Sequence, residues 1–170
     1  MKQISKKILA IVIAGMLGII QAKSQTATAT GAYTTSISGG YTIFTFTGNV
    51  TFTPGSSINV DYLVVAGGGG GGYWGGGGGA GGLLSGTGFG VTATTYNITI
   101  GAGGNGTASR TTRGSNGSNS VFSSLTATGG GGGGSDNTGT PADPPNHGAG
   151  GGSGGGGVSF PSVGTVRNCI

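Results

Sequence analysis

Three residues near the end of the chain have the types that a nucleophilic hydrolase uses. Ser153 lies in Gly-Gly-Ser-Gly-Gly, which has the spacing of a nucleophile elbow, and Asp143 and His147 precede it. That elbow needs a strand-to-helix turn and the chain order Ser, Asp, His, whereas here the order is Asp, His, Ser in a loop rich in Pro and Gly. The sequence therefore predicts no catalytic residues, and we expect the protein not to be an enzyme.

A second set of residues has the spacing of a nucleotide-binding loop. Gly67–Gly72 follows a strand-like segment and fits G-x-G-x-x-G, but that fold also needs a helix next and an acidic residue about 20 residues further on. Neither is present, because the first acid after Asp61 is Asp136. A phosphate P-loop needs a lysine, and no lysine follows Lys23. We therefore expect no cofactor.

Metal-binding residue types are equally sparse. Cys169 is the only cysteine and His147 the only histidine, so neither a thiolate zinc site nor an internal disulfide framework can form. Asp136, Asn137 and Asp143 offer oxygen ligands, but their spacing matches no calcium-binding loop. The sequence predicts no metal site.

The candidate binding residues are aromatic and polar. Tyr73-Trp74 separates two runs of glycine, and Trp74 is the only tryptophan. Aromatic anchors on a rigid frame are common in recognition surfaces, although the pair could equally cap the edge of the glycine region. Residues 136–147 form the second candidate loop, because three prolines stiffen it. The predicted binding residues are Tyr73, Trp74, Asp136, Asn137 and His147.

Blocks of glycine dominate the rest of the chain, which contains 45 glycines. The blocks are Gly67–Gly72, Gly75–Gly79, Gly129–Gly134 and Gly148–Gly157, the last interrupted by Ala149 and Ser153. They could be flexible loops or extended left-handed helices of the polyglycine II type, which have three residues per turn and no internal hydrogen bonds. Because the blocks are nearly pure and are flanked by strand-like sequence, we expect packed helices.

Short β-strands are expected between these blocks. Alternating and β-branched patterns predict strands at 41–47, 50–53, 58–66, 96–100, 120–122, 125–128 and 163–166. Gly48-Asn49 has the composition of a turn between the first two. The chain contains no glutamate and no lysine after Lys23, so the strong helix formers are missing. We therefore expect an all-β fold, a small sheet or sandwich with the glycine blocks as packed polyglycine II-type helices.

The N-terminus predicts export from the cytoplasm. Residues 1–24 combine a basic start, the apolar run Ile8–Ile20 and a small-residue cleavage site at Ala22-Lys23-Ser24, which is typical of a signal peptide. Residues 25–39 are expected to be a Thr/Ala/Ser-rich leader, and residues 40–170 the glycine-rich β domain. After cleavage no membrane span is expected, and the location is predicted to be extracellular or at the cell surface.

Charge limits the partners of the exported chain. Residues 25–170 contain three arginines and three aspartates, so they carry no net charge. Binding to nucleic acid needs a basic surface, and none is present. We therefore expect no nucleic-acid partner, and the sequence leaves the oligomeric state open.

The order of the motifs resembles a known family. Phe44-Thr45-Phe46-Thr47, Tyr62–Ala66 followed by glycine, Ile98–Gly104 and the Gly129–Gly134 block look like the glycine-rich domain family of secreted bacterial proteins and phage tail-fibre or adhesin proteins. The resemblance covers roughly residues 40–157. Family members typically close with Gly-Ser-Gly and a run of valines and isoleucines, which the segment after Gly157 lacks, so the closing strand is expected to be either degenerate or cut short.

That resemblance implies a secreted, non-enzymatic structural or adhesive module. In related phage adhesins, polyglycine helices display recognition loops, so a cell-surface glycan or surface protein is the implied partner. Ice or glycan binding is the alternative function, since a flat glycine-helix face carrying Thr or Ala could order water.

Overall fold

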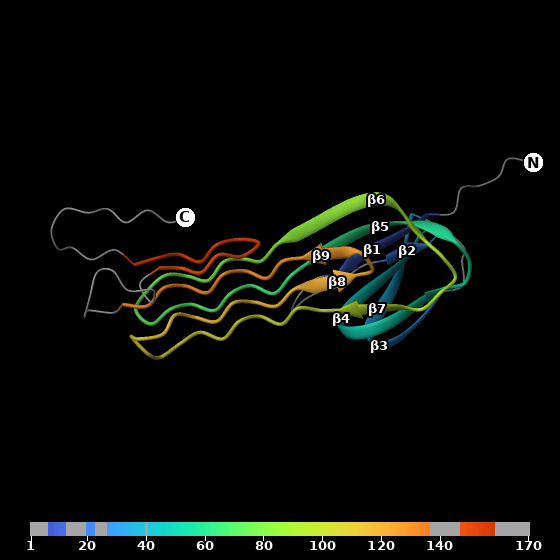
Figure 1. Ribbon diagram of the computed structural model, residues 1–170. Helices are drawn as coiled ribbons and strands as arrows, with labels where there is room; N and C mark the ends of the chain where they lie inside the picture. Colours follow the sequence, from blue (N-terminus) through green and yellow to red (C-terminus); the bar gives the residue numbers. More distant parts are fainter. Residues whose placement is uncertain (1–6, 13–19, 23–26, 40, 137–146, 159–170) are drawn as a thin grey trace, which may run out of the picture. The chain divides into compact units, whose positions relative to one another are not determined.

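The computed structural model describes residues 7–12, 20–22, 27–39, 41–136 and 147–158 (Figure 1). These residues form nine strands and no helix, which confirms the predicted all-β class. The strands are β1 (Lys7–Val12), β2 (Ile20–Ala22), β3 (Ala27–Ser38), β4 (Tyr41–Pro54), β5 (Ile58–Val65), β6 (Leu83–Val91), β7 (Tyr96–Thr99), β8 (Ser120–Phe122) and β9 (Leu125–Ala127). Nothing in the described chain forms a helix that could cross a membrane.

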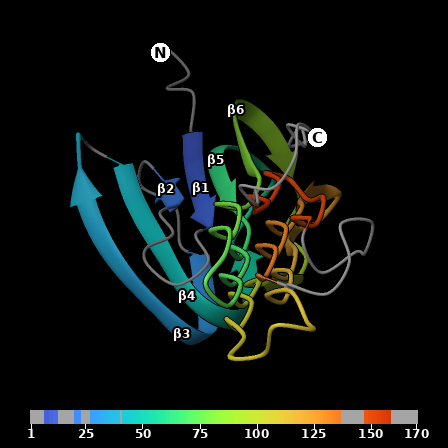
Figure 2. The same cartoon turned by 90° about the vertical axis from the view of Figure 1, so that its left-hand side faces the viewer.

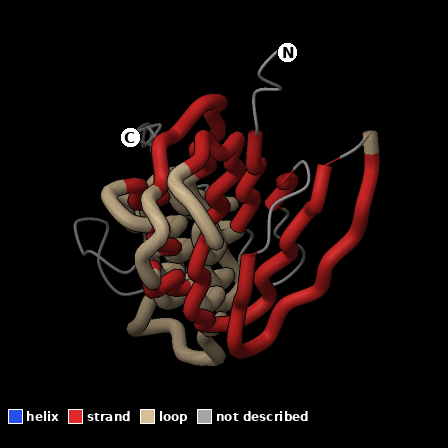
Figure 3. The backbone as a smooth tube through the Cα atoms, turned by 90° about the vertical axis from the view of Figure 1, so that its right-hand side faces the viewer, coloured by secondary structure: helices blue, strands red, loops and turns tan. Residues whose placement is uncertain are grey.

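The chain divides into two compact units. One, the β unit, comprises residues 1–65, 83–100 and 120–126, and the other, the glycine unit, comprises residues 66–82, 101–119 and 127–170. The strands carry almost all of the regular structure, and the glycine blocks are drawn as loops in Figure 3. The chain enters the glycine unit each time a strand has just ended.

β4 organises the β unit because it pairs along both of its edges. β3 runs antiparallel to it from the Ala27–Pro54 pair to the Ser38–Tyr41 pair. On the other edge, the first half of β4 pairs with β1 and β2, and the second half pairs with β7. The strand order is β6-β5-β1-β2-β4-β7-β8-β9.

Phe44 and Phe46 lie in the core of the β unit, but β4 is buried on both faces over residues 43–46 and not in alternation. Phe44 and Phe46 are 5% and 0% exposed, and the ring of Phe52 lies edge-on to both, with centroids 5.4 and 6.1 Å away. Val60 and Val64 of β5 are fully buried as well. Edge-to-face aromatic pairs add to the hydrophobic term, so these rings account for much of the stability of the unit.

Three features differ from the expectations. Gly48 and Asn49 form no turn but lie inside β4, and the Asn49 side-chain oxygen accepts a hydrogen bond from the Ile100 N–H at 2.9 Å. The expected leader, residues 25–39, contains β3, whose backbone pairs with β4 while nearly all of its residues stay exposed, so no core pattern marks it. β6 was not predicted, because glycines interrupt its alternation. The strand expected at 163–166 lies outside the described residues.

Part of the predicted signal peptide pairs with the sheet in the full-length chain. β1 runs parallel to β5 from the Lys7–Asn59 pair to the Val12–Val64 pair, and it also runs parallel to β4. Export processing remains a prediction. If it occurs after Ser24, the exported chain loses both β1 and β2.

The glycine unit is held together by backbone hydrogen bonds between different segments. The donors recur at every third residue: the N–H groups of Gly76, Gly79 and Gly82 bond to the carbonyls of Gly134, Gly131 and Thr128 at 2.8, 2.8 and 2.7 Å. Figure 2 shows these segments end-on as adjacent coils. Residues 66–72 and 128–134 are the inner segments, since each bonds to at least four other segments.

Only glycine fits most interior positions of this unit. A Cβ on Gly79 would overlap the carbonyl oxygen of Ser153 and lie 2.7 Å from that of Gly154. A Cβ on Gly133 would overlap the carbonyl oxygen of Gly76 in the same way. Because the obstructing atoms belong to the backbone, they cannot rotate aside as a side chain could. Close packing of backbones is therefore the reason for the glycine blocks.

We expect Gly79→Ala to lower the free energy of unfolding of the glycine unit by about 3 kcal/mol, the upper range for an overpacked interior. The matched control is Gly77→Ala, where a Cβ meets nothing within 4 Å. That change should raise stability by up to about 1 kcal/mol, because alanine restricts the unfolded chain. Denaturant titration followed by Trp74 fluorescence measures both. Equal changes in the free energy of unfolding for the two variants would contradict the close backbone packing at Gly79.

Deleting residues 1–24 should leave the β1-facing edges of β4 and β5 without backbone partners. We expect faster amide exchange in residues 59–64 and 44–46 than in the full-length chain, with residues 96–98 of β7 unchanged. Hydrogen exchange read by mass spectrometry compares the two chains. Identical rates in 59–64 would show that β1 makes no lasting pairs.

Candidate functional site

Tyr73 and Trp74 form a stacked aromatic pair in the glycine unit. Their ring centroids lie 5.5 Å apart and the planes differ by only 6°. Trp74 is 74% exposed, and its backbone has a φ of 45°, in the left-handed region that favours glycine. Such strain, of order 1–3 kcal/mol, persists where the surroundings fix the conformation and is most common at functional sites. The exposure argues against the capping role that the sequence left open.

The hydrogen-bond period of the glycine unit fixes the position of this pair. Gly67 and Gly70 donate their N–H groups to Ser118 and Ser115 carbonyls, and three residues later Tyr73 donates its N–H to the Ser135 hydroxyl at 2.8 Å. Ser135, which is fully buried, in turn donates to the Thr112 carbonyl at 2.5 Å. The aromatic pair is therefore attached to two other segments through one buried serine.

Arg110 completes the group. Its guanidinium carbon lies 5.1 Å from the centroid of the Trp74 ring and 5.7 Å from that of Tyr73, within the range of cation–π attraction. We call these three residues the Tyr73–Trp74–Arg110 cluster. Sequence reasoning missed Arg110, because its contact with the rings depends on how the glycine segments align.

Hydroxyl groups hold the loop that carries Arg110. The hydroxyls of Thr107 and Thr112 bond to each other at 2.8 Å, and the Ser109 N–H donates to the Thr107 hydroxyl at 3.1 Å. The Thr111 N–H donates to the Ser109 hydroxyl at 3.2 Å. A loop fixed in this way loses little conformational entropy when a ligand binds.

The other predicted binding residues are only partly brought to this cluster. Asp136 lies beside it, because its N–H donates to the Tyr73 carbonyl at 2.9 Å, and its Oδ1 is buried with no hydrogen-bond partner among the described residues. His147 is exposed, and no described contact joins it to the aromatic pair. Asn137 lies outside the described residues.

The described residues do not include a complete Ser-His-Asp triad of the hydrolase type. Asp143, the third member of the rejected triad, lies outside them, and Ser153 contributes its backbone carbonyl to a hydrogen bond from the Gly131 N–H at 2.8 Å. No group of three His, Cys, Asp or Glu side chains in the described chain could hold a metal ion. What the cluster offers instead is an exposed π-face with a cation beside it.

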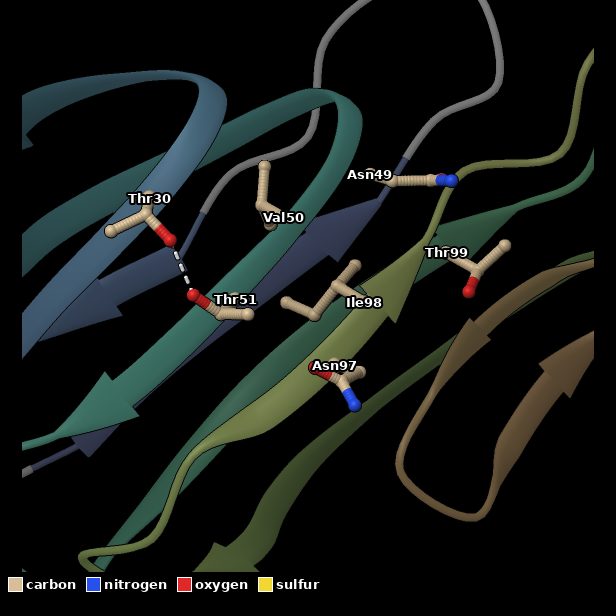
Figure 4. A pocket seen from close by; sticks show the side chains of 7 residues that line it. All are labelled: Thr30, Asn49, Val50, Thr51, Asn97, Ile98 and Thr99. Atoms are coloured by element: carbon tan, nitrogen blue, oxygen red, sulfur yellow. Dashed lines mark hydrogen bonds between the residues drawn. The ribbon is translucent and has the colours of Figure 1, made fainter.

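A hollow in the β unit is the other candidate (Figure 4). It has a volume of about 360 Å³ and is lined by Thr30, Asn49, Val50, Thr51, Asn97, Ile98 and Thr99. The hydroxyls of Thr30 and Thr51 bond to each other, and the Asn49 side-chain oxygen accepts a hydrogen bond from the Ile100 N–H. No charged side chain lines this hollow, and several of its polar groups are already paired, so the Tyr73–Trp74–Arg110 cluster is the stronger candidate.

We expect Trp74→Gly to change the stability of the glycine unit by no more than about 1 kcal/mol. Glycine relieves about 1–2 kcal/mol of left-handed backbone strain. That gain offsets the lost ring stacking, about 0.5–1.5 kcal/mol, together with the flexibility of glycine in the unfolded chain. Denaturant titration followed by circular dichroism measures the difference. A loss of about 3–5 kcal/mol, as for a buried aromatic residue, would identify Trp74 as a packing residue.

Comparison with known proteins places the chain in a family. The sequence profile of a family described as a glycine-rich domain matches residues 43–168. No curated protein and no solved structure matches the chain. The matched range includes all of the motifs on which the resemblance was based, from Phe44 in β4 to Gly134. The chain therefore belongs to the glycine-rich domain family.

Proposed function

We propose that the protein is an exported, non-enzymatic binding module of an adhesive or structural type. In this proposal the glycine unit is a rigid scaffold, and the Tyr73–Trp74–Arg110 cluster is the surface that it displays. The observation that carries the proposal is the 74% exposure of Trp74. Its backbone is strained, and the preceding residue, Tyr73, is hydrogen-bonded to the buried Ser135. An exposed aromatic ring held in place is typical of recognition surfaces.

The scaffold is best explained as packed helices of the polyglycine II type. Such a helix has three residues per turn and makes no hydrogen bonds within itself, so its N–H and C=O groups must pair with neighbours. The donors at Gly76, Gly79 and Gly82 have this spacing, and their acceptors lie on another segment. Asparagines support the same lattice, since Asn116 and Asn119 accept from the N–H groups of Gly132 and Gly129 at 2.9 Å.

The partner is proposed to be a cell-surface glycan or a surface protein. Export through the predicted signal peptide would place the cluster outside the cell, where such partners are found. The neutral charge of residues 25–170 argues against electrostatic attachment to nucleic acid or to anionic lipid. The family's occurrence in phage adhesins and secreted bacterial proteins is consistent with this assignment.

Ice binding is the second candidate, and one feature of the β unit favours it. The register of β3 and β4 pairs Thr28 with Thr53 and Thr30 with Thr51, and the Thr53 hydroxyl also bonds to that of Thr95 at 2.9 Å. Rows of threonine on adjacent strands could order water. Thermal hysteresis and ice-crystal shaping distinguish this function from adhesion.

Fluorescently labelled protein should bind to a panel of bacterial surfaces or to a glycan array, and Trp74→Gly should reduce that binding at least about tenfold, as expected for an aromatic anchor. The matched control is the double variant His147→Ala/Ser153→Ala, which should bind as the parent chain does. Binding that survives Trp74→Gly would exclude the cluster as the recognition surface. Hydrolysis of an ester or glycoside substrate that the double variant abolishes would contradict a non-enzymatic function.

A further inference from the structure

We propose that the Tyr73–Trp74–Arg110 cluster binds a sugar that carries a carboxylate, such as a hexuronic acid residue within a polysaccharide. This inference rests on the proposed binding function and specifies its ligand. Two observations support it: the high exposure of Trp74 and the position of the Arg110 guanidinium beside both rings.

The Trp74 ring provides a flat, solvent-exposed platform. Tyr73 stacks parallel to the indole and the Arg110 guanidinium lies over the same ring, yet Trp74 remains 74% exposed. The C–H face of a pyranose ring can stack on such a platform without surrounding walls. A peptide side chain serving as an anchor usually needs a desolvated pocket, and a ring this exposed does not lie in one.

Arg110 adds a positive charge that is not neutralised by the described residues. Its described contacts are with the two rings and not with a carboxylate. Among the described residues the Asp136 Oδ1 is buried without a hydrogen-bond partner, so that oxygen does not pair with Arg110 either. A guanidinium stays charged at all physiological pH values, and its planar fork matches the two oxygens of a carboxylate.

The surroundings favour a carboxylate over a phosphate. Phosphate sites usually combine a cation with several convergent backbone N–H groups or a helix N-terminus. Here the described N–H groups of Tyr73, Thr111 and Asp136 already donate to oxygens of the protein. A single fixed guanidinium beside a π-face fits one carboxylate on a ring that stacks, which is the shape of a uronic acid.

The test compares two probes that differ only at C6, a carboxylate in one and a hydroxymethyl group in the other: a tetrasaccharide of β-1,4-linked glucuronate and the glucose tetrasaccharide with the same linkage. Trp74 is the only tryptophan, so its fluorescence reports binding at the cluster. We expect the acidic probe to bind about 10- to 100-fold more tightly, the range for a hydrogen bond to a charged group. Raising the salt concentration should reduce this preference, because the contact is exposed.

The decisive variant is Arg110→Gln, which should remove the preference for the acidic probe and leave binding of the neutral one unchanged. Arg113→Gln is the matched control, as it removes the same charge three residues away in the same unit. It should preserve the preference. Circular dichroism melting curves of both variants should coincide with that of the parent chain, so that a change in binding is not a loss of fold.

Each contrary result has a distinct meaning. Equal binding of the two probes, or a preference that survives Arg110→Gln, would overturn the assignment to acidic sugars. If neither probe binds but the labelled chain still attaches to cell surfaces through Trp74, the ligand is not an acidic sugar of this kind, and the proposed function stands. Absence of any surface or glycan binding overturns both.

Discussion

The structure depends on one constraint, the contact of backbone with backbone in the glycine unit. Where a Cβ on Gly133 would overlap the Gly76 carbonyl, no other residue fits without moving a neighbouring segment. An interior without side chains gains little from burying apolar surface, so its peptide groups must be paired by neighbours. The regular bonding between segments satisfies that demand and explains why the blocks occur together rather than singly.

The same constraint decides where function can be located. Large side chains do not fit at most interior positions of the bundle, so we expect those that recognise a partner to lie at its surface and in the turns that join its segments. Tyr73, Trp74 and Arg110 lie in two such turns, and the Ser135 hydroxyl joins them by accepting from the Tyr73 N–H and donating to the Thr112 carbonyl. The loop of Arg110 is held by hydroxyl groups instead of hydrophobic contacts. Hydrogen bonds, and not a hydrophobic core, therefore hold the backbone of the cluster in place.

Much of the β unit could be predicted from sequence, because alternation and burial are local. Phe44 and Phe46 show the inward face of β4 directly. β3 and β6 were missed for opposite reasons, the first because it pairs by backbone while its side chains stay exposed, and the second because glycines break its pattern. Arg110 could not be placed, since its contact depends on alignment between segments distant in sequence. The three-residue spacing of Asn116 and Asn119 was a signal that could have indicated that alignment.

An interior made of peptide groups also has a thermal consequence. Unfolding a hydrophobic core raises the heat capacity, because apolar surface becomes hydrated, whereas exposing polar groups lowers it. For the glycine unit, where segments such as 66–72 and 128–134 meet through N–H and C=O groups, the apolar contribution is small and the polar one opposes it. Its stability curve is therefore flat compared with that of an ordinary domain, and the unit weakens less on cooling than the phenylalanine-rich sheet to which it is joined along the chain.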